Sequence, residues 1–238
     1  MENRPRILCI SGFDPSGGAG MMADIRTVES CGGEPIGVLT ANTIQNHEQF
    51  LGLTWESMDQ ITRGLEAIQS LEPAAIKLGI CQSLQQVNEL VAVCRQFFPR
   101  VPLVWDPVLK STSGGSFLEN IDQTPFPEVD LITPNRTEAD QLNCLTKGDY
   151  CLVKSDKVVG DNLMDQLYHK GVPIQRWVNE RAPGAEKRGT GCIMSSGIAT
   201  FLGLGFDLPT AITKTESFLQ TYYRSSPGKT GKYVYENH

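Results

Sequence analysis

The chain has 238 residues, of which 40% are hydrophobic, so it is long and apolar enough to bury the core of one large α/β domain. Its formal net charge is −6 and no cluster of lysine and arginine stands out, which argues against nucleic acid or an anionic membrane as the main partner. We therefore expect a single domain over residues 1–238 that binds a small molecule.

The sequence contains no charged segment followed by a long apolar one at its start, and no run of about 18 apolar residues anywhere. These patterns predict a soluble, cytoplasmic protein. The seven cysteines form no C-x-x-C pair and join no histidine cluster at zinc spacing. We expect all except Cys192 to be reduced thiols of the core or surface.

Residues 6–10 form a short apolar run, typical of a strand that is buried on both faces. A glycine-rich loop, Ser11 to Gly20, follows it and leads into a helix predicted over Met21 to Cys31. The loop glycines do not fit G-x-G-x-x-G, so no dinucleotide fingerprint is predicted. The loop serves either the close approach of a ligand to bare backbone or only as a flexible surface segment, and Pro15 favours the first.

Apolar runs and amphipathic segments then alternate, which predicts an α/β fold with a mostly parallel sheet and helices on both faces. An antiparallel pair with its turn at Lys170-Gly171 and a loosely held tail after 227 complete the prediction. The predicted strands cover 35–41, 50–54, 74–79, 101–105, 130–133, 150–154, 163–168 and 172–178, and the predicted helices 58–71, 83–98, 193–204 and 208–225.

Polar residues follow several of these strands, where α/β folds bind ligands. Gln45 is either a reader of a ring edge, because its amide offers an acceptor and two donors, or an ordinary surface glutamine. Asp106 could hold a metal or a proton, or simply form a turn. Asn135 and Glu138 have the spacing of a helix capping box, and the alternative places Glu138 at a magnesium ion through water.

The stretch Lys187 to Cys192 precedes the apolar helix predicted over 193–204. Gly189 and Gly191 allow a tight turn with N–H groups pointing one way, and the helix start adds free donors and the positive end of its dipole. This pattern predicts an anion site in which the helix field stabilises either a Cys192 thiolate or the approach of a negatively charged group, so that Cys192 is placed for chemistry on a phosphate. The alternative is a glycine turn before a packing helix, with Cys192 as a small hydrophobe.

Together these motifs resemble the hydroxymethylpyrimidine and hydroxymethylpyrimidine phosphate kinases of thiamine biosynthesis, within the ribokinase-like superfamily that also contains pyridoxal kinases. The resemblance covers nearly the whole chain, and the motifs occur in the family's order. They are Gly12 to Gly20 with Ala23-Asp24, Thr40-Ala41, Gln45-Asn46, Lys77-Leu78-Gly79, Asp106-Pro107-Val108, Thr133-Pro134-Asn135 with Glu138, and Gly189-Thr190-Gly191-Cys192.

The resemblance implies roles for residues of both halves of a site. It implies ATP and Mg²⁺ as cofactors and a homodimer as the assembly, with Cys192 as the base where most of the superfamily has aspartate. The implied substrate residues are Gly12, Ala19, Asp24, Gln45, Ile80 and Val108, and the implied nucleotide residues are Asn135, Lys154 and Arg188. The implied metal ligands are Asp106 and Glu138, and the implied anion hole and catalytic residues are Gly189, Thr190, Gly191 and Cys192.

Two departures from the family pattern fall in what we expect to be the nucleotide half. Only residues 143–149 stand where family members run through a further helix, so we expect a shortened nucleotide half. The family's Lys-Gly-Gly-His turn appears as Lys154-Ser155-Asp156-Lys157, in which Asp156 adds a like charge, and the histidine before the anion loop is Arg188.

The sequence therefore predicts a ribokinase-like kinase that uses ATP and Mg²⁺ to phosphorylate 4-amino-5-hydroxymethyl-2-methylpyrimidine, its monophosphate, or both. Two alternatives stay open. One is a pyridoxal kinase, whose substrate also carries a ring nitrogen beside polar substituents. The other is a non-catalytic, regulatory pyrimidine-binding paralogue, which the shortened nucleotide half favours.

Overall fold

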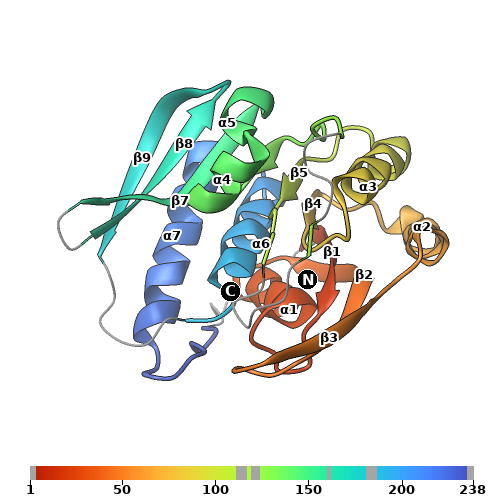
Figure 1. Cartoon of the computed structure of the whole chain (residues 1–238), viewed down its shortest axis with the longest axis horizontal. Coiled ribbons are helices and arrows are strands. Elements are labelled where there is room, and N and C mark those ends of the chain that lie inside the picture. The colour runs from red at the N-terminus through yellow and green to blue at the C-terminus, as the bar shows by residue number, and fades with distance from the viewer. Residues whose placement is uncertain (1–3, 111–116, 119–123, 160–161, 181–186, 235–238) are drawn as a thin grey trace.

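A computed structural model describes residues 4–110, 117–118, 124–159, 162–180 and 187–234. In this part of the chain the strands form one nine-stranded sheet in the order β3-β2-β1-β4-β5-β6-β7-β8-β9 (Figure 1). The six strands from β2 to β7 in this order are parallel, and β3, β8 and β9 are antiparallel to their neighbours. The bounds are β1 Arg6–Phe13, β2 Glu34–Gln45, β3 Phe50–Trp55, β4 Ala75–Leu78, β5 Leu103–Trp105, β6 Leu131–Ile132, β7 Tyr150–Val159, β8 Asn162–His169 and β9 Val172–Glu180.

Helices cover both faces of the sheet, as the alternation of patterns predicted. Helices α2, α3, α4 and α5 pack on one face and α1, α6 and α7 on the other. Strand β1 shows why, because Leu8 and Ile10 are buried on the first face while Ile7 and Cys9 are buried on the second. The helices are α1 Gly20–Ser30, α2 Met58–Ala67, α3 Leu84–Phe97, α4 Arg136–Leu142, α5 Cys144–Lys147, α6 Thr190–Gly203 and α7 Leu208–Arg224.

Two strands run further than their apolar patterns predicted. Strand β1 continues to Phe13 and β2 to Gln45, so Gly12 and Gln45 lie within strands rather than beyond them. The two extensions pair with each other, since Gly12 lies opposite Ala41 and Phe13 opposite Asn42. Backbone pairing thus carries the polar and glycine residues of the motif into the sheet.

The prediction of a loosely held tail is wrong for its described part, residues 227–234. The Tyr233 ring packs on Tyr222 of α7 with centroids 5.1 Å apart, and the Arg26 guanidinium lies 5.8 Å from the centre of the Tyr233 ring. The Lys229 carbonyl accepts a 2.8 Å hydrogen bond from the Arg188 N–H. The packing of Tyr233 and a backbone hydrogen bond therefore hold this segment in place, although its polar composition gave no sign of either contact.

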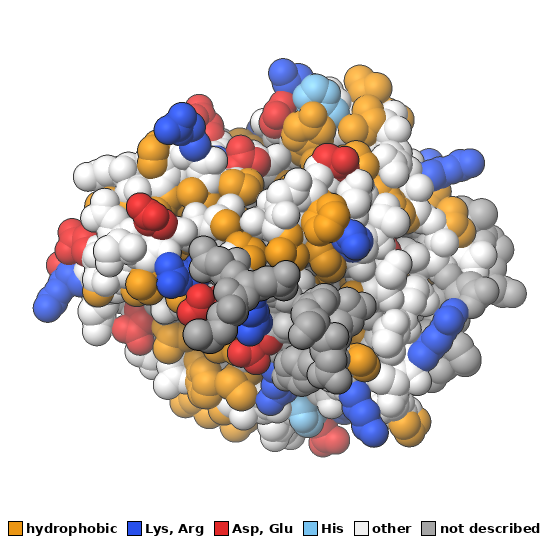
Figure 2. All heavy atoms as spheres, turned by 180° about the vertical axis from the view of Figure 1, so that it is seen from behind, with side chains coloured by type: hydrophobic (Ala, Val, Ile, Leu, Met, Phe, Trp, Pro, Cys, Tyr) orange, Lys and Arg blue, Asp and Glu red, His pale blue; other side chains and the backbone are white. Residues whose placement is uncertain are grey.

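The segment between α4 and β7 is short, as the sequence predicted. This segment contains one helical turn, α5, before β7 begins. No helix among the described residues is long and apolar enough to cross a membrane. On the face seen in Figure 2, basic and acidic side chains are interspersed, in keeping with the absence of a basic cluster in the sequence.

Candidate active site

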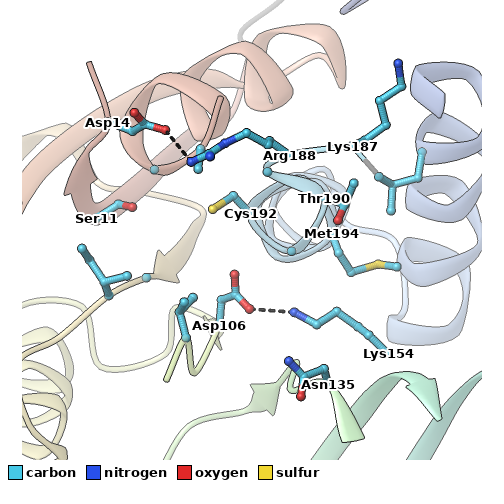
Figure 3. Close-up of a pocket in the computed structure, with 18 of the residues that line it drawn as sticks. Ser11, Asp14, Asp106, Asn135, Lys154, Lys187, Arg188, Thr190, Cys192 and Met194 are labelled. Carbon is cyan, nitrogen blue, oxygen red and sulfur yellow. Dashed lines mark hydrogen bonds and ion pairs between the residues drawn. The ribbon is translucent and has the colours of Figure 1, made fainter. Parts of the chain in front are cut away.

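A cavity of about 800 Å³ lies at the carboxyl ends of the parallel strands (Figure 3). It takes residues from the ends of β1, β2, β4 and β5, from the start of α6, and from β7, β8 and α7. Parallel strands bring their carboxyl ends to one edge of a sheet, so motifs far apart in sequence meet there. Of the site residues implied by the resemblance, the cavity is lined by Gly12, Ala19, Gln45, Ile80, Asp106, Val108, Asn135, Glu138, Lys154, Arg188, Gly189, Thr190, Gly191 and Cys192.

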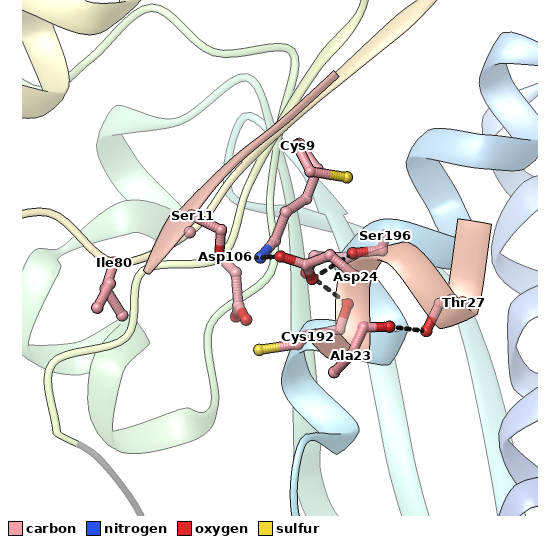
Figure 4. Close-up of polar contacts among 12 residues, drawn as sticks. Cys9, Ser11, Ala23, Asp24, Thr27, Ile80, Asp106, Cys192 and Ser196 are labelled. Carbon is pink, nitrogen blue, oxygen red and sulfur yellow. Dashed lines mark hydrogen bonds and ion pairs between the residues drawn. The ribbon is translucent and has the colours of Figure 1, made fainter. Parts of the chain in front are cut away.

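Asp24 is the exception, and its expected place at the pocket surface is wrong. Its side chain is fully buried and forms a 2.8 Å ion pair with Lys77 (Figure 4). Its other oxygen accepts a 2.6 Å hydrogen bond from the Ser196 hydroxyl of α6. Asp24 points inward from α1, so it supports the cavity wall from behind while Lys77 lines the cavity.

The anion loop has the backbone that its glycines predicted. Gly189 adopts a left-handed φ of 74° and caps α6, and no side chain caps the first turn of this helix. A side chain at Gly191 would come within 3.2 Å of the Lys154 Nζ and 3.3 Å of an Asp106 oxygen. The uncapped N–H groups therefore face the cavity, where an anion can approach bare backbone.

Asp106 and Lys154 form an ion pair of 2.8 Å beside this loop. Burial opposes the charge of Lys154, but Asp106 and Glu138 outweigh it and raise the pKa of Lys154. The second carboxylate oxygen of Asp106 is buried and has no hydrogen-bond partner among the described residues. The Lys154 ammonium and an unsatisfied oxygen of Asp106 therefore both lie beside Gly191 of the anion loop.

The capping box predicted for Asn135 and Glu138 is confirmed. The Asn135 side chain accepts from the Glu138 N–H at 2.9 Å, and the Glu138 carboxylate accepts from the Asn135 N–H at 2.8 Å. The other Glu138 oxygen accepts a longer bond, 3.4 Å, from the Leu109 N–H. Burial raises the pKa of Glu138, and Asp106 adds to this shift while Lys154 opposes it.

These residues fit a magnesium ion that arrives with a nucleotide. No group of three or more His, Cys, Asp or Glu in the described ranges could hold a metal without help. Mg²⁺ in phosphoryl-transfer sites commonly rests on one or two carboxylates, phosphate oxygens and water. The unsatisfied Asp106 oxygen suits a direct contact, whereas Glu138, whose oxygens already accept backbone N–H groups, suits a contact through water.

Of the two effects predicted for the helix start at Cys192, the stabilised thiolate is wrong. Burial raises the pKa of Cys192 to about 12, and Asp24 and Asp106 add to the shift. Lys77 and the Gly20 N–H oppose it without reversing it. Cys192 is half-buried whereas the other six cysteines are buried, and none of the seven forms a disulfide bond within the described residues. The Cys192 side chain is therefore a neutral thiol near neutral pH.

Arg188 lies with substrate residues, which corrects its expected place at the nucleotide. Its Nη2 is 3.4 Å from the Gln45 Oε1 and 3.9 Å from an Asp14 oxygen. The side chain is buried beneath the glycine-rich loop, where a side chain at Gly18 would contact its Nε at 3.2 Å. In Figure 3 the sulfur of Cys192 lies between the Arg188–Asp14 pair and the Asp106–Lys154 pair.

The surroundings of Asp156 differ from the prediction for the nucleotide half. Asp156 is buried away from the cavity lining, where it pairs with Arg136 and accepts a 3.1 Å hydrogen bond from the Tyr168 hydroxyl. Ser155 lines the cavity and adopts a left-handed φ of 49°, so the chain keeps a glycine-like turn there without a glycine.

The sequence patterns missed an acidic pair at the cavity wall, Asp165 on β8 and Glu216 on α7. Both are buried. Burial raises the pKa of Glu216 to about 10, and a hydrogen bond with Asp165 adds to the shift. Neither residue belongs to a motif or follows a strand end, so only the packing of α7 against the last hairpin brings them together.

The sequence profile of one family, described as phosphomethylpyrimidine kinase, matches residues 14–147 and 144–236. The two matches meet at α5, where the chain is shortened. The curated hydroxymethylpyrimidine/phosphomethylpyrimidine kinase of Staphylococcus aureus (strain MRSA252) is 29% identical over 94% of this chain and 90% of its own length. The thiamine biosynthesis multifunctional protein ThiED of Corynebacterium efficiens is 28% identical, and this chain spans 33% of its length.

Solved structures show the same fold. The phosphomethylpyrimidine kinase from Clostridium difficile 630 superposes with a TM-score of 0.72 at 26% identity, over 90% of this chain and 97% of that one. The pyridoxal kinase from Staphylococcus aureus in complex with AMP-PCP gives 0.79 at 22% identity, over 94% and 89%. Since the family profile covers nearly all of residues 14–236, the chain belongs to the phosphomethylpyrimidine kinase family, a family of phosphotransferases.

Proposed function

We propose that this kinase transfers the γ-phosphoryl group of ATP to the hydroxymethyl group of an aminopyrimidine, to the corresponding monophosphate, or to both, in thiamine biosynthesis. One observation carries the proposal. One cavity is lined by the uncapped anion loop, by the Asp106–Lys154 pair beside it, and by the half-buried Gln45. The names of the relatives at 28–29% identity support the substrate class.

The proposed chemistry follows from charge and position. Phosphoryl transfer depends mostly on positioning and on stabilising the charge of the equatorial oxygens. The N–H groups of residues 189–192 and the Lys154 ammonium would do both. When bound, Mg²⁺ would neutralise phosphate charge, with Asp106 as its direct protein ligand.

The substrate hydroxyl must also lose a proton. Cys192 lies at the end of the anion loop and is proposed to accept it. With a pKa of about 12, only a small thiolate fraction exists near neutral pH, so general-base assistance by this thiol would grow with pH.

An ATP-consumption assay tests the proposal with three acceptors, namely hydroxymethylpyrimidine, its monophosphate and pyridoxal. We expect consumption with one or both pyrimidines. Consumption with pyridoxal alone would assign the pyridoxal kinase alternative, and binding of pyrimidine without turnover would assign the regulatory one. Calorimetry should show pyrimidine binding without nucleotide and weak ATP binding, because α5 leaves little wall beside the nucleotide.

We also propose that residues 1–238 form one domain that assembles as a homodimer. Light scattering should then give twice the chain mass of 26.1 kDa. Unfolding at fixed protein concentration should show one cooperative transition. A monomeric mass, or two separate transitions, would contradict these two points respectively.

A further inference from the structure

Two buried cysteines that the proposed chemistry does not use lie in contact in the core. The sulfur of Cys144, at the start of α5, is 3.3 Å from the sulfur of Cys151, in β7. Cys144 is fully buried and Cys151 is 1% exposed. Because a disulfide bond holds its sulfurs about 2.05 Å apart, an approach of little more than about 1 Å separates this pair from a covalent bond.

The hydrogen bonds of the pair describe its resting state as two thiols. The Cys144 S–H donates to the Ala139 carbonyl at 3.6 Å, which leaves the Cys144 sulfur to accept from the Cys151 S–H. This hydrogen bond and burial both raise the pKa of Cys151, which therefore stays protonated. Since the thiolate is the form that reacts, Cys151 is a poor first target for an oxidant.

Cys144, in contrast, belongs to an element that can open by itself. Helix α5 is a single turn, closed by a 2.8 Å bond from the Gly148 N–H to the Cys144 carbonyl. Asn143, directly before it, has a left-handed φ of 52°, a conformation that only glycine adopts without cost. Strand β7 is hydrogen-bonded between β6 and β8 inside the sheet. One short turn opens more readily than a central strand, so Cys144 meets solvent before Cys151 does.

We propose that Cys144 and Cys151 form a reversible modification site, which hydrogen peroxide converts to a disulfide that fastens α5 to β7. While α5 is open, the Cys144 thiolate attacks one peroxide oxygen, the O–O bond breaks, and a sulfenic acid forms as hydroxide leaves. When α5 closes, the Cys151 sulfur attacks the Cys144 sulfur and the S–O bond breaks. The departing hydroxide takes the Cys151 proton and leaves as water. Two thiols and one peroxide thus give one disulfide and two waters, and a dithiol reverses the reaction.

The cross-link would join the short segment between α4 and β7 to the strand that carries Lys154. It closes a loop over residues 144–151, which removes conformational freedom from the unfolded chain and should stabilise the oxidised protein. No ligand takes part, so this inference does not depend on the proposed function.

Peptide mapping of the full chain tests the proposal directly. Trypsin cleaves after Arg136, Lys147 and Lys154, so the two cysteines fall in separate peptides, 137–147 and 148–154, each with one cysteine. The protein is treated with hydrogen peroxide, its remaining thiols are alkylated, and it is digested without reductant. We expect these two peptides to be linked, at a yield roughly tenfold or more above any other cysteine–cysteine link, because their sulfurs start in contact.

Two further measurements on the wild type follow the bond. Dithiothreitol should separate the linked peptides. The urea midpoint of the oxidised protein should lie about 0.5 to 1 M above that of the reduced protein, and the shift should vanish on reduction.

Cys151→Ser should abolish the link and leave a sulfenic acid at Cys144 that dimedone labels, and Cys151→Ala serves if the serine variant fails to fold. Cys94→Ser is the matched control, since it removes another buried thiol of the same core cluster and should keep the link. Oxidation of Cys192 without any link between 137–147 and 148–154 would show that peroxide reached the protein and would overturn the inference. Similar yields of several different cysteine links would indicate general unfolding and would overturn it as well.

Discussion

Lys77 and Asp24 form an ion pair of 2.8 Å whose two side chains are both fully inaccessible to solvent. Burial opposes the charge of Lys77, but Asp24 and Asp106 raise its pKa, so the ammonium stays charged. Ser196 donates to the second Asp24 oxygen, which links β4, α1 and α6 behind the cavity wall. The floor of the proposed active site is therefore an internal charge pair.

Removing one member of this pair should be far more damaging than removing both. Lys77→Met leaves Asp24 as a buried, unpaired carboxylate, and we expect a loss of about 3 to 5 kcal/mol in the free energy of unfolding. The double variant Lys77→Met with Asp24→Leu should recover most of that loss. Urea unfolding of the two single variants and the double variant measures the coupling, and additive losses would contradict this account.

Variants of Cys192 should distinguish the contribution of the thiol to turnover from that of the anion loop. A base is typically worth about a hundredfold to ten-thousandfold in rate, so Cys192→Ala should lose most turnover but keep the fold and much of the pyrimidine affinity. Cys192→Asp should retain some activity, as a carboxylate occupies this position in the wider superfamily.

The pH profile checks the role of Cys192 independently. Below a pKa of about 12 the thiolate fraction rises tenfold per pH unit, so kcat should climb from pH 7 to 9 in the wild type and stay flat in Cys192→Ala. A flat wild-type profile would mean that Cys192 is not the base. Cys192 should also be the first cysteine to be alkylated, with bound pyrimidine protecting it and the six buried cysteines serving as internal controls.

Gln45→Ala should weaken the pyrimidine and leave ATP nearly unaffected. A buried donor–acceptor pair left half-made costs about 1 to 3 kcal/mol, or roughly tenfold to a hundredfold in affinity. Calorimetry with each ligand measures both effects, and Gln85→Ala on the exposed side of α3 is a matched control. An equal loss of affinity for pyrimidine and for ATP would show that Gln45 does not contact the edge of the ring.

Ser155→Gly should stabilise the protein. Ser155 adopts a left-handed φ of 49°, a conformation that costs a residue with a Cβ about 1 kcal/mol or more relative to glycine. We expect a gain of about 1 kcal/mol in the free energy of unfolding, read from the urea midpoint at constant m-value. Ser70→Gly, at a site without a positive φ, should show no such gain.

Glu216 should make stability fall as pH rises. Its pKa is raised from the ordinary 4.5 to about 10, so between these values the folded state holds a proton that the unfolded state has lost. The free energy of unfolding should then decline by up to about 1.4 kcal/mol per pH unit in this window. Thermal unfolding from pH 6 to 9 should show a flatter decline in Glu216→Gln, whereas the exposed-site control Glu89→Gln should follow the wild type.

The sequence by itself determined the elements and most of the cavity lining. Periodicity identified the strands and helices because each depends on which faces are buried, and strand-end residues such as Gln45 and Asp106 lie at one edge because parallel strands must end there. The glycines around the anion loop were equally decisive, since Gly189 takes a left-handed φ and Gly191 leaves room for Lys154 and Asp106.

The tertiary structure alone decided the electrostatics. Whether Asp24 faces ligand or Lys77, and whether Asp156 meets a phosphate or Arg136, depends on packing between elements that no local pattern encodes. The same holds for Cys192, whose helix-start position predicted a thiolate but whose burial raises its pKa to about 12. Charge energies depend on surroundings and on distances across the fold, so a motif can place a side chain at a site without fixing its ionisation or its partner.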